Sequence, residues 1–403
     1  MAVPFSQFLL TAMVWLLLSP VALFAQDISS NSLKNPIGLE DWRPEVNLVD
    51  FSSNLVLEQL PMLDSILDRY QFFFMGEEHW KTINTEIQWS FLRYLHQQAG
   101  VRNLIVEGGY SFGFLLNQYL SSGDEGILKK ALTNIPVCPE DQRSMYRRIY
   151  RYNQNLDPED RIQVTGIDVE HSPELVLQVL YTLRPEAKEV PRAIRKEMKQ
   201  LVELHESYYI VKSDVKRFFK RMGKSMARNE AVHREYWGTD FARVRMLAEN
   251  TLAGYEFKYL KAMIFEDTWQ ERESQMYSNF IALQPYMAQG GYFAQFGVLH
   301  TDLHESSQWE FPTLAQRLNK IDGSPVEDQV LTISRYVRRM DERYEALGQG
   351  EPMRRLIKYL ERRYPDQIVL CNMLGPDSPF PKLGKNFQYL ILIDEDLEES
   401  ACN

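Results

Sequence analysis

Two carboxylates and two imidazoles follow stretches of the chain that have the length and composition of β-strands. Glu77 and His79 stand in the sequence Gly-Glu-Glu-His-Trp, Glu107 precedes two glycines, and His300 closes the sequence Gly-Val-Leu-His. A carboxylate close to an imidazole can orient the ring, fix its tautomer and raise its basicity. These residue types indicate general-base chemistry on a bound small molecule.

The strands that carry these residues are expected at 70–75, 102–107 and 291–297. The first two lie about 30 residues apart and enclose a stretch, 81–98, whose apolar residues recur at helical spacing. A strand, a helix and a strand at this spacing favour parallel pairing. Because parallel strands bring their carboxyl ends to one edge of a sheet, we expect Glu77, His79, Glu107 and His300 to meet there.

Four further residues are weaker candidates. Arg272 shares a helical face with Met276 and Asn279, from which a guanidinium could neutralise a developing oxyanion or a substrate carboxylate. A third expected strand, 161–165, runs into Asp168 and His171, which we keep in reserve. Glu78 is equally well explained as an acidic residue that favours the start of a helix.

Several patterns have a plainer explanation than function. Lys212, Lys216, Lys220, Lys224 and Arg228 recur every four residues, which is typical of the solvated face of a helix. The sequence contains no P-loop, HExxH or GxGxxG motif. His96, His205 and His233 are expected at surface or packing positions.

The alternation of helical and strand patterns predicts an α/β fold with a mostly parallel sheet flanked by helices. Residues 70–403 would form this domain, and the glycine-poor, charged stretch 185–288 would be a helical insertion or cap. Other helices are expected at 110–120, 124–133, 139–155, 312–318 and 353–363, and other strands at 328–334, 367–371 and 387–392.

The N-terminal region predicts export. Residues 8–25 are apolar and end in a polar stretch, which indicates a signal peptide over 1–25 and a secreted or periplasmic protein; an uncleaved membrane anchor is the alternative. Residues 26–69 would form a lead-in that packs an amphipathic helix, 55–67, onto the domain. No later segment is apolar enough to span a bilayer.

The net charge and the cysteine content exclude some classes of partner and site. A net charge of −10 argues against nucleic-acid binding, so a small-molecule substrate is the expected partner, and the oligomeric state stays open. Cys138, Cys371 and Cys402 are too few and too scattered for a disulfide scaffold or a zinc site. We expect Cys371 to be buried and inert, and one bridge among the three remains possible.

Taken in order, the motifs resemble a known superfamily. Gly-Glu-x-His, Glu107, Arg272-Glu-x-x-Met-x-x-Asn and Gly-x-x-His300 occur in this order in the erythromycin-esterase-like and haem-uptake (ChaN-like) proteins. The resemblance covers residues 70 to 305 and implies an α/β fold. The esterase branch has two residues between its Glu and His, whereas here a single residue separates Glu77 from His79, as in the haem-uptake branch. Glu273 stands where the family has Asp.

The resemblance to the esterase branch implies hydrolysis of a macrolactone ester by an activated water, without metal or other cofactor. On this basis Glu77, His79, Glu107 and His300 would be catalytic and Arg272 would line the site. The leading hypothesis is an exported ester or lactone hydrolase with His79 or His300 as general base. Two alternatives are a haem- or iron-binding uptake protein, with histidine and Tyr110 as possible ligands, and a metal-dependent hydrolase using His79 and His300.

Overall fold

A computed structural model of the 403-residue chain describes residues 42–49, 60–79, 81–133, 139–186, 188–207, 211–257, 266–304, 311–338, 350–375 and 378–393. Its centre is an eight-stranded sheet in the order β1-β7-β8-β6-β2-β5-β3-β4. The strands are β1 (Val46–Val49), β2 (Phe72–Glu77), β3 (Val101–Gly109), β4 (Gln163–Asp168), β5 (Gly291–Gly297), β6 (Val330–Val337), β7 (Ile368–Asn372) and β8 (Tyr389–Ile393).

The strands from β4 to β8 in this order run parallel, and β7 is antiparallel to both of its neighbours, β8 and β1. In β2 the side chains from Phe72 to Met75 are all buried, so both faces of the strand are covered. Continuous apolar runs of this kind are typical of parallel strands that carry helices on both faces. The α/β fold class with a mostly parallel sheet is therefore confirmed.

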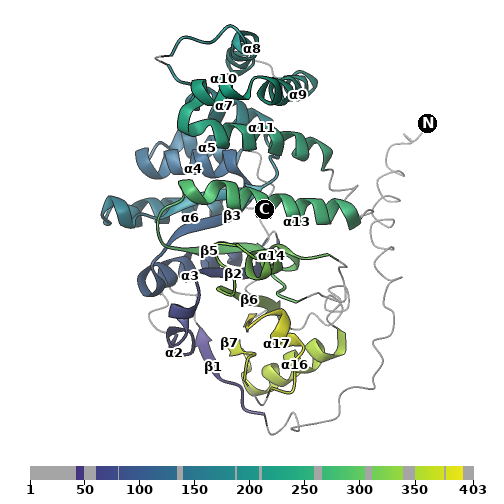
Figure 1. The fold of residues 1–403 in the computed structure, drawn as a ribbon. Helices are drawn as coiled ribbons and strands as arrows, with labels where there is room; N and C mark the ends of the chain where they lie inside the picture. Colours follow the sequence, from purple (N-terminus) through teal and green to yellow (C-terminus); the bar gives the residue numbers. More distant parts are fainter. Residues whose placement is uncertain are drawn as a thin grey trace, which may run out of the picture.

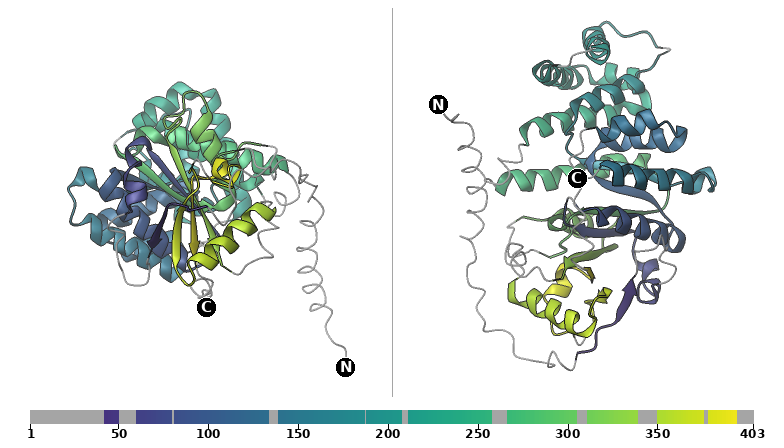
Figure 2. Two further views of the ribbon diagram at one scale, coloured as in Figure 1. Left: turned by 90° about the horizontal axis from the view of Figure 1, so that it is seen from below. Right: turned by 180° about the vertical axis from the view of Figure 1, so that it is seen from behind.

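Helices lie on both faces of the sheet (Figure 2). Those that connect or flank the strands are α2 (Pro61–Asp64), α3 (Ile83–Ala99), α4 (Tyr110–Ser122), α5 (Glu125–Leu132), α6 (Pro139–Asn153), α7 (Pro173–Leu183), α14 (Leu314–Lys320), α16 (Gly350–Arg363) and α17 (Leu383–Asn386). Helix α3 ends at Gly100, whose φ of 64° is the left-handed conformation that glycine adopts at little cost.

The described residues between α7 and β5 are mostly helical, and α8 to α11 stand beyond the β4 edge of the sheet (Figure 1). It contains α8 (Arg195–Glu206), α9 (Lys212–Arg228), α10 (Glu230–Trp237), α11 (Phe241–Glu256) and α13 (Glu266–Leu283). Helix α9 buries Val215, Phe218, Phe219 and Met222 and exposes Lys212, Lys220, Lys224 and Arg228. Its basic stripe is the solvated face that the spacing predicted. Helix α13 returns beside β4 and brings Arg272 to the sheet.

The N-terminal lead-in differs from the prediction. Val46–Val49 form β1, which pairs with β7. Of the expected amphipathic helix 55–67, the described residues 60–67 contain α2 and the first residue of a 3-10 turn over Leu67–Arg69. The run 46–49 is too short for its own sequence to predict a strand. It forms a strand because the edge of β7 supplies its partner. The proposed signal peptide over 1–25 and most of the lead-in, including 50–59, lie outside the described residues.

Two smaller expectations can be compared with the described part of the chain. Cys371 is a buried free thiol whose pKa burial raises to about 12, which makes it inert; Cys138 and Cys402 lie outside the described residues. Within the described ranges, no helix combines the length and the apolar character needed to cross a membrane.

Candidate active site

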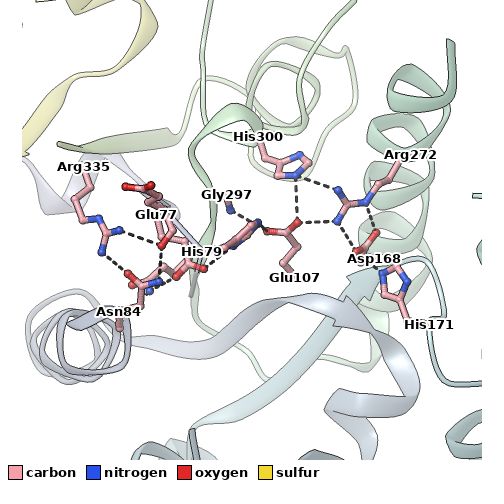
Figure 3. A network of polar contacts seen from close by, with 12 residues as sticks. Glu77, His79, Asn84, Glu107, Asp168, His171, Arg272, Gly297, His300 and Arg335 are labelled. Carbon is pink, nitrogen blue, oxygen red and sulfur yellow. Dashed lines mark hydrogen bonds and ion pairs between the residues drawn. The ribbon is translucent and has the colours of Figure 1, made fainter. Parts of the chain in front are cut away.

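The ends of four neighbouring parallel strands bring a network of charged side chains together (Figure 3). Glu77 ends β2, Glu107 lies near the end of β3, Asp168 ends β4, and His300 closes a 3-10 turn after β5. Strand β5 lies between β2 and β3, so the chain reverses the direction in which it adds strands at this point. Ligands of open α/β sheets bind at such a position.

Glu77 and His79 form a carboxylate–imidazole pair on the loop between β2 and α3. His79 Nδ1 lies 3.0 Å from Glu77 Oε1, and 45% of the His79 side chain is exposed. Burial lowers the pKa of His79, but the hydrogen bond to Glu77 and the charge of Glu107 outweigh it and raise the pKa above its usual value. The pair therefore presents an oriented imidazole at the surface of the network.

Glu107 is the centre of the network. A bulge in β3, where the register shifts between Val106 and Gly109, re-aims the strand at this residue. Its Oε2 accepts the Gly297 amide at 2.8 Å and lies 3.8 Å from His79 Nε2, while Oε1 accepts a hydrogen bond from Arg272 Nη2 at 2.7 Å. Burial would raise the pKa of Glu107, but His300 and Arg272 hold it well below its usual range. Glu107 is therefore ionised.

Arg272 joins two strand ends. Its Nε donates to Asp168 Oδ1 at 2.9 Å and its Nη2 to Asp168 Oδ2 at 2.6 Å, in addition to Glu107. The third guanidinium nitrogen, Nη1, does not bind either carboxylate. It lies 3.4 Å from His300 Nε2. The guanidinium is thus committed mainly to holding Glu107 and Asp168 in place. The oxyanion role expected for Arg272 stays a prediction that depends on Nη1.

His300 is buried between two carboxylates. Its Nδ1 contacts Glu273 Oε1, and its Nε2 lies 3.3 Å from Glu107 Oε1. Burial lowers the pKa of His300, but Glu273 and Glu107 outweigh it and raise the pKa to about 10. At neutral pH His300 is therefore an imidazolium that holds Glu107, which makes it a poor base.

Gly297 allows His79 to lie against β5. A Cβ atom at this position would lie 3.0 Å from His79 Nε2, 3.1 Å from its Cε1 and 3.6 Å from Glu107 Oε2. A side chain there would therefore occupy the space between the imidazole and Glu107. This close approach is a physical reason for glycine at the end of β5.

A second set of buried polar residues supports the loop that carries His79. Gln295 donates to Glu77 Oε2 at 2.6 Å, and Asn84 Nδ2 donates to the Glu78 carbonyl at 2.8 Å. Arg335, from β6, donates to Asn84 Oδ1 and, at 3.1 Å, to the same Glu78 carbonyl (Figure 3). The loop is thus fixed from β5, α3 and β6 together.

The structure places all five of the predicted site residues, Glu77, His79, Glu107, Arg272 and His300, in this single network. Sequence reasoning held Asp168 and His171 in reserve, although Asp168 is the principal partner of Arg272 and lies 3.0 Å from His171 Nε2. The strand-end position of Asp168 was the available signal. Glu273, Gln295 and Arg335 were not identified as site residues, because a helix or strand pattern does not show which of its polar residues turn toward the site.

The two alternatives gain little from these contacts. In the described part of the chain, no three His, Cys, Asp or Glu side chains converge so as to hold a metal ion, and the Arg272 guanidinium lies among the expected ligands. Tyr110, named as a possible haem ligand, is buried, and its hydroxyl accepts a hydrogen bond from Arg243.

Comparison with known proteins supports the fold. No family model matches the sequence, and no curated protein does either. Among solved structures, an erythromycin esterase, EreC, in its open conformation matches with a TM-score of 0.63 and 14% identity, over 87% of this chain and 97% of that one. The chain has the fold of this esterase.

Two other solved structures also match the fold of this chain. A succinoglycan biosynthesis protein matches with a TM-score of 0.61 and 14% identity, over 87% of this chain and 94% of that one. A Bacillus cereus protein matches with a TM-score of 0.58 and 15% identity, over the same shares of the two chains. The fold implied by the order of the motifs is confirmed, and at these identities the likeness concerns the fold alone.

Proposed function

We propose that this chain is a hydrolase that directs water at an ester or lactone, with His79 as general base. The observation that carries the proposal is the position of the His79 ring. The ring is half-exposed, and its Nε2 lies 3.8 Å from the ionised Glu107 carboxylate. A gap of this length between two polar atoms suits a bridging water. Such a water would contact both the base and an anion that orients it.

The Glu77 contact selects the tautomer that the reaction needs. A carboxylate only accepts hydrogen bonds, so Nδ1 of His79 carries the proton and the Nε2 lone pair is directed toward Glu107. His79 Nε2 then removes a proton from the water as the water oxygen attacks the carbonyl carbon. The C–O bond to the leaving group breaks, and the alkoxide recovers the proton from Nε2. Glu77 stabilises the transient imidazolium.

His300, charged and enclosed by Glu273 and Glu107, supports the site as a cation that fixes Glu107. Because a protonated imidazole cannot accept a proton, we assign the role of general base to His79 and not to His300. We assign Arg272 Nη1 as the donor to the developing oxyanion, because its other two nitrogens are bound to carboxylates.

The test is ester hydrolysis by the purified protein, with 4-nitrophenyl acetate and a simple lactone as substrates. A positioned base contributes about 10²- to 10⁴-fold to the rate, so His79→Ala should reduce kcat by about that factor. His205→Gln is the matched control, because His205 stacks on Tyr181 in the helical insertion. Full activity in His79→Ala would overturn the mechanism, and no activity in the wild type toward any ester or lactone would overturn the function.

We also propose that the protein is exported, on the basis of the apolar stretch 8–25. Mass spectrometry of protein from the periplasm or culture medium would identify its first residue. A chain that begins after Ala25 would support cleavage, an intact N-terminus in the membrane fraction would support the anchor, and protein confined to the cytoplasm would contradict export.

A further inference from the structure

A second carboxylate–imidazole pair lies in the network, on the other side of Glu107 from His79 (Figure 3). His171 Nε2 is 3.0 Å from Asp168 Oδ2, and 51% of the His171 side chain is exposed. In the rest of the network the side chains of Asp168, Arg272, His300 and Glu273 are each 8% exposed or less. The two half-exposed imidazoles are therefore the parts of the network that a substrate can reach most easily.

Asp168 fixes the orientation of His171. Its two oxygens are held by Arg272 Nε and Nη2, and Oδ1 also accepts the Val169 amide at 2.7 Å. A carboxylate held in this way cannot rotate, so it fixes the ring that it binds through Nε2. No described residue hydrogen-bonds to Nδ1 of His171, which leaves this nitrogen to meet a ligand.

The two imidazoles are too far apart to act on one bond. Glu107 and Asp168 lie on the adjacent strands β3 and β4, whose spacing is about 4.8 Å; His79 faces Glu107 from one side of this pair, and His171 contacts Asp168 on the other side (Figure 3). The separation is therefore on the order of 10 Å. A group bound by His171 would be a remote part of the substrate whose ester is attacked beside His79.

We propose that His171 forms a second subsite, which binds a carboxylate on the acyl part of the ester that the protein hydrolyses. The inference rests on the proposed function, and it names the class of substrate: an ester whose acyl chain carries a negative charge about 10 Å from the scissile carbonyl. Nδ1 donates the hydrogen bond and the imidazolium supplies the charge.

The protonation state of His171 gives the subsite a pH dependence. Because Nε2 donates to Asp168, Nδ1 donates only when the ring is an imidazolium. Burial lowers the pKa of His171, Asp168 and Glu170 raise it, Arg272 lowers it, and the net shift is upward. Carboxylate binding is therefore strong below that pKa and weakens as the pH rises through it.

The experiment compares two esters that differ in one charge. The first is the mono-4-nitrophenyl ester of suberic acid, which has a free terminal carboxylate. The second is the same ester with that carboxylate methylated. The ratio of their kcat/KM values at pH 6 should exceed one in the wild type and fall toward one at pH 9. His171→Ala should lower the ratio at pH 6 by about 10- to 100-fold, the usual cost of losing a charged hydrogen bond.

Two variants sharpen the comparison. His171→Gln keeps a neutral donor and removes the charge, so its ratio should lie between those of the wild type and His171→Ala and lose its pH dependence. His205→Gln is the control and should keep the wild-type ratio. A wild-type ratio near one, or an unchanged ratio in His171→Ala, would overturn the subsite.

If neither ester is hydrolysed, the proposed function fails and a binding measurement decides the subsite separately. Titration of ¹⁵N-histidine-labelled protein with suberate at pH 6 should shift the His171 ring resonances, identified by their absence in His171→Ala. A shift would retain the anion subsite without the hydrolase, and no shift would overturn it.

Discussion

His79 and His300 are both bound by carboxylates, and their surroundings give them opposite roles. His79 is half-exposed, with Glu77 at 3.0 Å and Glu107 at 3.8 Å, and its pKa is raised above its usual value. His300 is buried between Glu107 and Glu273, with a pKa of about 10. A base must be neutral near the working pH, so the closer carboxylate contacts of the buried His300 favour His300 as the structural cation and leave His79 as the proposed base.

The pH dependence of hydrolysis should report His79. Activity requires the neutral imidazole, so kcat/KM should rise with pH through a pKa above 6.5, the ordinary value. Glu77→Gln removes the negative partner and should shift this rise to lower pH. The kcat/KM of both proteins is measured from pH 5 to 9. An unchanged profile in Glu77→Gln would show that the group that titrates in the profile is not His79.

The requirement for glycine at position 297 can be tested in the same hydrolysis assay. Gly297→Ala would place a methyl group 3.0 Å from His79 Nε2 and displace the ring. Misplacement of a catalytic group by about 1 Å can cost about 100-fold, so a loss of at least about tenfold in kcat/KM is expected. Gly223→Ala, where a Cβ meets no atom within 4 Å, is the matched control and should retain activity.

Asp302 should limit stability above neutral pH. Its carboxyl is buried, no described residue hydrogen-bonds to it, and burial raises its pKa to about 7 from 3.8. The pKa of Asp302 is higher in the folded protein than in the unfolded chain. The unfolding free energy therefore falls as the pH rises from about 4 to about 7, where the buried carboxyl loses its proton. Asp302→Asn should therefore raise the unfolding free energy at pH 8 by about 1–4 kcal/mol and change it little at pH 4. Denaturant titrations at both pH values measure this, and equal effects at the two would contradict it.

At the scale of elements, the loop between β2 and α3 depends on contacts that come from strands distant in sequence. Gln295 in β5 and Arg335 in β6 bind Glu77, Asn84 and the Glu78 carbonyl. The loop that carries His79 is therefore fixed by the two strands that flank β2 in the sheet. Its position should be sensitive to substitutions that touch no substrate.

Asn84→Ala tests this dependence, because it removes both the acceptor for Arg335 and the donor to Glu78. Loss of buried hydrogen bonds of this kind costs about 1–3 kcal/mol of unfolding free energy. We expect that loss together with a lower kcat and faster hydrogen exchange at residues 77–82. Thr133→Ala, which removes an exposed hydrogen bond to the Lys129 carbonyl, is the control for the loss of one polar side chain. Normal kcat and exchange in Asn84→Ala would show that the loop holds its place without these contacts.

At the scale of the whole molecule, the ionic network ties the parallel strands to α13 and so couples the site to folding. Glu107 and Asp168 have lowered pKa values, so their contribution to stability is present above the unfolded values and lost in acid. His300 has a raised pKa, so its contribution is present below 6.5 and is lost as the pH rises through about 10.

The alkaline part of this behaviour can be isolated. Between pH 7 and 10.5 the wild type should lose on the order of 3 kcal/mol more unfolding free energy than His300→Gln, because the variant has no imidazolium to deprotonate. Parallel denaturant titrations of the two proteins give the difference directly. Identical pH slopes would show that His300 is not held as a cation in the folded protein.

Local sequence determined much of the fold and the positions of the first candidate residues. Apolar runs of strand length, helical periodicity and glycines at strand ends predicted the parallel sheet and β5 at Gly291–Gly297, and they placed Glu77, Glu107 and His300 at one edge. They failed at β1, a four-residue strand whose partner, β7, is distant in sequence. Short edge strands depend on that partner more than on their own residues.

Only the tertiary structure decided which residues share a charge environment. The sequence named two candidate bases and could not rank them, because a pKa depends on burial and on carboxylates that arrive from other elements. Glu273 reaches His300 from α13, and Asp168 reaches Arg272 from β4; neither contact leaves a periodic trace in the chain. The strand ends were set by local pattern, and the roles of the imidazoles at those ends were set by long-range packing.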